Sequence, residues 1–165
     1  MEKATKKEVQ ERLKRGKGSQ KQAIVAVAPE STPLEALLSG KKTSYCGFLK
    51  MKVMGDVTRE SVVEFVKESI DSKSVLFTDK NAAYANLEKM VEQHIKVKST
   101  PESTNGALNW VHMAISNLKK NLPGIYHMVS EKHLQNYLNE FASKLNRRYF
   151  GEKLFNRLII VSVYP

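Results

Sequence analysis

The fold is decided by the stretch Val75–Tyr84, whose sequence is VLFTDKNAAY. Its short apolar run predicts a buried strand, and this strand ends at the carboxylate of Asp79. In α/β folds, the carboxyl end of a buried strand is a common place for metal ligands and catalytic groups. Two interpretations of Asp79 stay open on this pattern: a functional carboxylate, or a residue that only caps the helical segment after it.

The composition indicates a basic globular protein. A chain of 165 residues suits one domain with a hydrophobic core, and its net charge of +10 indicates a polyanionic partner, most often nucleic acid. Cys46 is the single cysteine, which excludes an internal disulfide, fits a reducing compartment and predicts a small core residue. No apolar stretch approaches the ~20 residues that span a bilayer, and the N-terminus is too polar for a signal peptide. We therefore expect a cytoplasmic protein with no membrane partner.

The first part of the chain differs from the rest. Residues 1–22 are rich in lysine and arginine, including Arg15 and Lys17, and contain little apolar surface to anchor them. This composition predicts a basic N-terminal arm, which either lies along phosphates or remains a solvated tail. Residues 23–165 then form the folded domain.

The segments around Val75–Tyr84 alternate between strand and helix patterns. Residues 23–28 are apolar on both faces, which predicts a central strand covered by helices on each side, and residues 45–54 alternate as in a half-buried strand. Thr58 is the expected N-cap of a helix. A short helix is expected over residues 81–93, followed by a short strand around residues 95–97. This order predicts an α/β sheet with helical cover.

From Ala107 the pattern is helical. A polar stripe runs beside the apolar face of the first helix, formed by Asn109, His112, Ser116 and Lys119. Pro123-Gly124 is expected to break this helix, and Ser130 to cap the next one, which ends in the basic residues 146–148. Residues 154–164 are ambiguous, because their β-branched residues favour a strand whereas their spacing fits a helix.

The residues that suggest chemistry are few. The chain contains no P-loop, no GxGxxG, no CxxC pair, no HExxH and no GxSxG, and its four histidines are scattered. Asp79, His112 and Lys119 are the one set that the pattern can bring together, an acid at a strand end and a helical stripe meeting at a divalent ion over a phosphodiester. Two-metal phosphoryl transfer needs two or three such ligands, so this signal is weak without further support.

The sequence resembles a known family at several places. Leu76–Tyr84 is similar to the segment around the second acid of bacterial insertion-sequence DDE transposases of the ISXO-like group. The resemblance continues in order through residues 109–119, is densest in Gly124–Gln135 (GIYHMVSEKHLQ), and extends to residues 137–141 and 146–148. Residues 15–19 and 23–28 fit more loosely. The resemblance implies a fold similar to ribonuclease H, with a mixed sheet flanked by helices. This chain departs from the family in lacking the first strand of that sheet.

The resemblance also implies roles for individual residues. Asp79 matches the second acid, a ligand of Mg²⁺ or Mn²⁺, and Lys119 matches a lysine that holds a DNA phosphate. His112 stands where the family has Glu or Asn, and its nitrogen suits Mg²⁺ poorly. Further DNA contacts are expected from Lys120, Arg147, Arg148, Arg15 and Lys17. The first acid should lie on a strand before residues 15–18, and this chain has no such strand.

Two functions follow as hypotheses. The first is a transposase domain that cleaves DNA ends and transfers strands with Mg²⁺ or Mn²⁺, impaired by the loss of the first catalytic acid, with Asp79 and His112 as catalytic metal ligands. The alternative is a catalytically inactive fragment that binds DNA or full-length transposase, as a regulator or a remnant. Self-association is a further possible partnership. An unrelated basic α/β binding module also stays open on charge alone.

Overall fold

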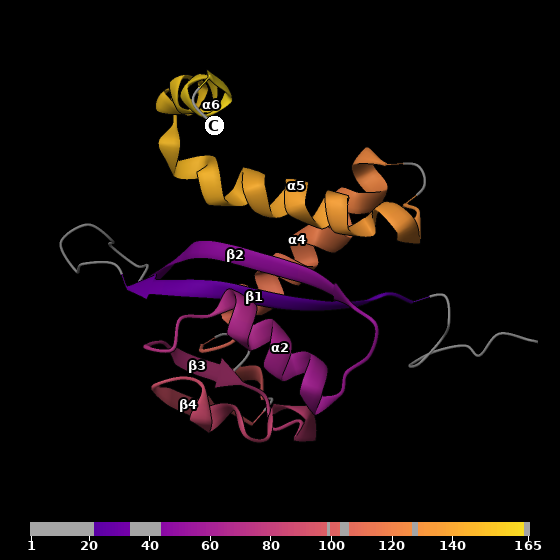
Figure 1. The fold of residues 1–165 in the computed structure, drawn as a ribbon, viewed down its shortest axis with the longest axis vertical. Coiled ribbons are helices and arrows are strands. Elements are labelled where there is room, and N and C mark those ends of the chain that lie inside the picture. The colour runs from indigo at the N-terminus through magenta and orange to yellow at the C-terminus, as the bar shows by residue number, and fades with distance from the viewer. Residues whose placement is uncertain (1–21, 34–43, 99, 103–105, 127–128, 164–165) are drawn as a thin grey trace, which may run out of the picture.

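The computed structural model describes residues 22–33, 44–98, 100–102, 106–126 and 129–163, which form two small sheets flanked by helices (Figure 1). In chain order the strands and helices are β1 (Ile24–Pro33), β2 (Ser44–Met54), α2 (Arg59–Ser69), β3 (Val75–Thr78), β4 (Gln93–Lys96), α4 (Asn109–Ile125), α5 (Leu134–Arg147) and α6 (Lys153–Val163). Single turns of 3₁₀ helix are η1 (Ala82–Tyr84), η2 (Leu87–Lys89), η3 (Glu131–His133) and η4 (Arg148–Phe150). The predicted arm, with Arg15 and Lys17, lies outside the described residues apart from Gln22.

β1 and β2 pair in antiparallel orientation, and the alternation predicted for β2 is confirmed. Leu49 and Met51 are buried while Lys50 between them is exposed, and Cys46 is buried as predicted. The pairing shifts register between Pro29 and Ser31, and Phe48 on β2 beside this shift is exposed. Such an irregularity changes which side chains face the core. β2 is therefore the half-buried strand that its sequence indicates.

β1 differs from the sequence prediction. The strand itself is confirmed, but among the described residues it pairs with β2 alone and is not central in a sheet. Its apolar residues Val25–Ala28 are only half-buried. α4 contacts β1, and Val25 and Val27 pack at the margin of the main core. A sequence that is apolar on both faces is thus left with an unpaired edge.

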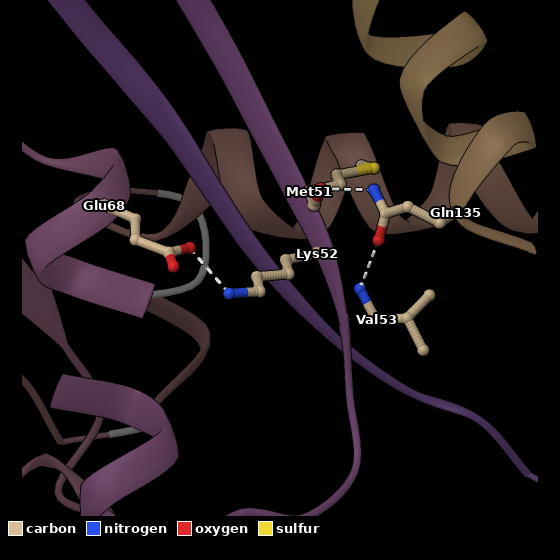
Figure 2. Close-up of polar contacts among 5 residues, drawn as sticks. All are labelled: Met51, Lys52, Val53, Glu68 and Gln135. Atoms are coloured by element: carbon tan, nitrogen blue, oxygen red, sulfur yellow. Dashed lines mark hydrogen bonds and ion pairs between the residues drawn. The ribbon is translucent and has the colours of Figure 1, made fainter. Parts of the chain in front are cut away.

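α2 packs against the turns η1 and η2, which lie between β3 and β4 in the chain. Its predicted N-cap is confirmed, because the Thr58 hydroxyl accepts a hydrogen bond from the Ser61 N–H. The cluster beneath it is formed by Val62, Val66, Ala83, Leu87 and Val91, with Met54 and Leu76 at its margin. An ion pair of 2.6 Å between Lys52 on β2 and Glu68 on α2 joins this helix to the first sheet (Figure 2). α2 therefore contacts both sheets.

β3 and β4 form a parallel pair, which confirms the strand predicted at the start of Val75–Tyr84. The predicted burial of this strand is wrong, because the side chains of Val75 and Phe77 are exposed and those of Leu76 and Thr78 are only half-buried. The helix predicted over residues 81–93 is wrong in part: the chain forms the separate turns η1 and η2. Asn86 has a φ of +75°, in the left-handed region, and so interrupts any continuous helix.

The main core lies between the first sheet and the helices α4 and α5. It is formed by Leu49, Met51, Ala114, Leu118, Leu134, Leu138 and Ala142. The expected break at Pro123 is wrong, because α4 continues to Ile125 with Pro123 in its last turn. A proline there removes one helical hydrogen bond, while the Tyr126 N–H still donates to the Leu122 carbonyl at 3.0 Å.

The ambiguous C-terminal segment is helical. α6 lies across the end of α5 (Figure 1), and it exposes large apolar side chains, among them Phe155, Ile160 and Val163. Arg157 lies over the ring of Phe150, 4.2 Å from its centroid. In the described part of the chain, no helix has the length and apolar character that a membrane span requires.

Candidate functional site

Asp79 follows directly on β3 and is exposed. Its Oδ1 accepts a hydrogen bond from the Asn81 N–H at 3.1 Å, and the Asn81 side chain in turn accepts from the Ala83 N–H at 3.0 Å as the N-cap of η1. Capping of the turn is therefore done by Asn81. Among the described residues no hydrogen bond reaches the other carboxylate oxygen of Asp79, which remains available to a ligand.

The backbone at Asp79 is held by a side-chain network. The Thr78 hydroxyl donates to the Asp79 carbonyl at 3.0 Å and lies 2.8 Å from His94 Nε2. Since Thr78 has one hydroxyl hydrogen, His94 Nε2 acts as the donor to Thr78, and its Nδ1 is buried without a partner among the described residues. Burial, followed by the charge of Lys96, lowers the pKa of His94, which favours this neutral form.

Tyr84 lies near the same carboxylate. Burial of its phenol raises the pKa of Tyr84, and the negative charge of Asp79 raises it further. Asp79 thus stands at a strand end near the Tyr84 phenol, and its second carboxylate oxygen is an exposed oxygen ligand of the kind that binds a cation.

His112 and Lys119 both lie on α4 and are exposed. They are seven positions apart, so they project from the same side of the helix, opposite to the buried residues Ala114 and Leu118. The predicted polar stripe is confirmed in this respect. Within the residues that the structure describes, no hydrogen bond or ion pair connects Asp79 with His112 or Lys119.

The fit to a metal ion is partial. The carboxylate of Asp79 is an oxygen ligand of the kind that Mg²⁺ and Mn²⁺ prefer, whereas His112 offers a nitrogen. No group of three or more His, Cys, Asp or Glu residues suited to a metal occurs among the described residues. The described residues thus bring together fewer ligands than two-metal phosphoryl transfer needs.

The other predicted DNA contacts lie in two places. Lys120 is exposed on α4, and Arg147 is exposed near the end of α5, where it donates to the Ser143 hydroxyl. Arg147 also lines a pocket of about 380 Å³ between β2 and α5. Arg148 is engaged internally: it donates to the carbonyls of Leu145 and Cys46 and lies 4.1 Å from the centroid of the Tyr149 ring.

Two amide side chains on α5 were not predicted. Gln135 accepts from the Val53 N–H at 2.8 Å and donates to the Met51 carbonyl at 3.1 Å (Figure 2). Asn146 accepts from the Leu49 N–H at 2.7 Å and donates to the Leu49 carbonyl at 3.0 Å. Gln135 and Asn146 are eleven positions apart, about three helical turns, and hence on one face of α5. This spacing of two amide residues was the feature of the sequence that could have indicated their contact with β2.

Comparison with known proteins adds one finding. The family model described as "ISXO2-like transposase domain" matches residues 2–146. No curated protein and no solved structure matches the chain. The matched range includes Asp79, His112 and Lys119, and it ends before Arg147 and α6.

Proposed function

The chain belongs to the family of ISXO2-like transposase domains, and from this premise we propose that it cleaves the DNA ends of an insertion sequence and transfers them to target DNA. The observation that carries the proposal is the exposed carboxylate of Asp79, which follows the carboxyl end of β3. One of its oxygens accepts a hydrogen bond from the Asn81 N–H, and the other accepts none from the described residues. A ribonuclease H-like arrangement of residues 23–165, preceded by a basic arm over residues 1–22, forms part of the same proposal.

Each residue has a defined role in this proposal. Asp79 binds Mg²⁺ or Mn²⁺, which when bound supplies positive charge for phosphoryl transfer. His112 takes the position of a further ligand, and Lys119 holds a DNA phosphate on the same side of α4. The reaction is impaired, because one carboxylate and one histidine are a small ligand set for this chemistry.

The proposal is tested by comparing DNA cleavage by the native chain and by a variant that lacks the Asp79 carboxylate. The purified chain with Mn²⁺ is expected to nick labelled DNA that carries the ends of the element, and Asp79→Ala is expected to abolish the product. The matched control is Asp71→Ala, which removes another exposed carboxylate, in the segment before β3. Cleavage that survives in Asp79→Ala, or that falls equally in both variants, contradicts the role of Asp79.

A second candidate is an inactive fragment that binds DNA or a full-length transposase. It is favoured by the small ligand set, since Asp79 and His112 belong to no cluster of three potential ligands among the described residues. This candidate predicts DNA binding that is independent of metal and is not followed by cleavage. Gel-shift titrations with Mn²⁺ and with a chelator, each followed by denaturing electrophoresis, distinguish the two candidates.

A further inference from the structure

The two edges of the β1–β2 sheet differ in how their backbone groups are hydrogen-bonded. The outer edge of β2 is occupied, because Asn146 bonds the N–H and C=O of Leu49 while Gln135 bonds the C=O of Met51 and the N–H of Val53 (Figure 2). Each amide supplies one donor and one acceptor, as a neighbouring strand would. Side chains that cover an edge prevent its pairing with other chains.

The opposite edge, formed by β1, has no such cover from the residues that the structure describes. In an antiparallel pair, two opposite residues either bond each other through their backbone groups or both point these groups away from each other. Val53 and Met51 bond Gln135 instead of β1. Their opposite residues, Val25 and Val27, therefore direct their N–H and C=O away from β2. No hydrogen bond from another described residue reaches these groups.

The sequence of β1 fits an edge that is meant to be paired. Ile24–Ala28 (IVAVA) contains no charged residue, whereas exposed edges usually carry lysine or a similar guard. Pro29, opposite Leu49, is the next residue whose backbone faces outward, and it has no N–H to donate to a neighbouring strand. The open edge therefore extends over residues 24–28 and ends at Pro29.

β3 presents a second open edge. The Val97 N–H donates to the Thr78 carbonyl at 2.8 Å, which places the backbone groups of Thr78 and Leu76 on the β4 side. The backbone groups of Val75 and Phe77 then point away from β4, and their side chains are 47% and 42% exposed. Down the view of Figure 1 the strands follow the order β2, β1, β3, β4, and α2 is drawn between β1 and β3. Met54 of β2 and Leu76 of β3 pack against the same cluster under α2, so one helix is shared by the two sheets.

We propose that an extended segment of a partner protein, different from this chain, pairs with β1 over residues 24–28 and faces β3 with its other edge, so that the two sheets become one. An extended backbone is the chemistry that supplies alternating donors and acceptors to such an edge. The segment is apolar on both faces where it meets Ile24–Ala28, since these residues are apolar on both faces. Acidic residues at its ends complement the net charge of +10.

A peptide of this chemistry tests the proposal on the whole chain. The probe is a capped peptide with a core of about six alternating valine and alanine residues and glutamates at both ends. Amide exchange is followed by NMR, and the exchange of Val25, Val27, Val75 and Phe77 is expected to slow by about tenfold or more when the peptide is present. Ala26, whose N–H already faces β2, is expected to change little and serves as an internal reference.

Two controls identify backbone pairing. A peptide with N-methyl groups at alternate residues keeps its side chains but loses the donors of one edge, and it is expected to give no protection. Val27→Pro removes one outward N–H and is expected to weaken binding, whereas Val27→Thr keeps the N–H and is expected to bind normally. If Val27→Pro does not fold, as judged by circular dichroism, the N-methylated peptide decides the question.

Three results overturn the proposal. The first is equal protection by both peptides, which indicates non-specific apolar binding. The second is slow exchange of Val25 and Val27 in the peptide-free monomer, which shows that the chain's own residues already cover the edge. The third is protection of Val25 and Val27 without peptide at high protein concentration, where the mass doubles. This result assigns the edge to a second copy of this chain.

Discussion

At the scale of single residues, Asp56 gives a prediction about pH. Its Oδ1 accepts hydrogen bonds from the Ser61 hydroxyl at 2.6 Å and from the Thr58 hydroxyl at 2.8 Å, with the Thr58 N–H at 3.2 Å. These bonds, that from Ser61 foremost, hold the pKa of Asp56 below its usual value near 3.8. A lowered carboxyl pKa stabilises the folded state above the unfolded pKa, and this stability is lost as pH falls through the folded pKa. The melting temperature of Asp56→Asn is therefore expected to lie below that of the native chain at neutral pH, with the gap closing below about pH 4. A gap that is constant with pH contradicts this assignment.

Residue-scale features were predictable where they depend on local geometry. Thr58 as N-cap needs only a hydroxyl before a helix, and it is confirmed. The sequence pattern suggested Asp79 as a possible cap near β3 and did not suggest Asn81, although both side chains carry a suitable oxygen and lie two positions apart. The backbone conformation at Asn81 decides between them, since its own side chain reaches the Ala83 N–H.

At the scale of elements, the contact between α5 and β2 gives a stability prediction. Gln135→Ala leaves the N–H of Val53 and the C=O of Met51 without their partners in a part-buried position. Because each such group loses its hydrogen bond without full access to water, the free energy of unfolding is expected to fall by about 2 kcal/mol. Urea unfolding of Asn136→Ala, an exposed neighbour on α5, provides the control and is expected to change little. Equal effects of the two substitutions would show that helix composition, not the contact with β2, is being measured.

The elements themselves were predictable where one local pattern dominates. β2 follows its alternation, α2 its cap and α5 its apolar stripe, and the positions of these elements are confirmed. The cap predicted for α5 is wrong: Ser130 precedes η3 and makes no capping hydrogen bond with its side chain, and α5 begins only at Leu134. The predicted end of the helix at Pro123 was wrong. A proline in the last turn removes only one helical hydrogen bond, and α4 continues to Ile125. Residues 154–164 stayed ambiguous, since β-branched residues and helical spacing oppose each other there; a strand also needs a pairing partner, which a local pattern cannot reveal.

At the scale of the whole molecule, the pairing of strands limited what could be predicted. The sequence indicated a sheet with a covered central strand over residues 23–28, whereas the described residues form two pairs of strands with open edges on β1 and β3. Burial of a strand on both faces depends on neighbours that are distant in sequence. The site is limited in the same way: Asp79 follows the end of β3 and the stripe of His112 and Lys119 lies on α4, as predicted, but their mutual arrangement depends on how the sheets assemble.

The charge of the whole molecule leads to the last prediction, on DNA binding. With a net charge of +10, binding to duplex DNA is expected to weaken steeply as salt rises from about 50 to 200 mM, because phosphate contacts release counterions. If the exposed lysines of α4 contact phosphates, Lys119→Ala with Lys120→Ala is expected to reduce the slope of log K against log salt by about 2, roughly 1 for each lysine. Fluorescence anisotropy with labelled duplexes measures this slope. The control, Lys67→Ala with Lys73→Ala, removes the same charge from exposed positions in α2 and in the segment after it. Since net charge alone acts equally in both double variants, an equal fall in slope contradicts the specific role of α4, and a slope that changes only in the α4 variant supports it.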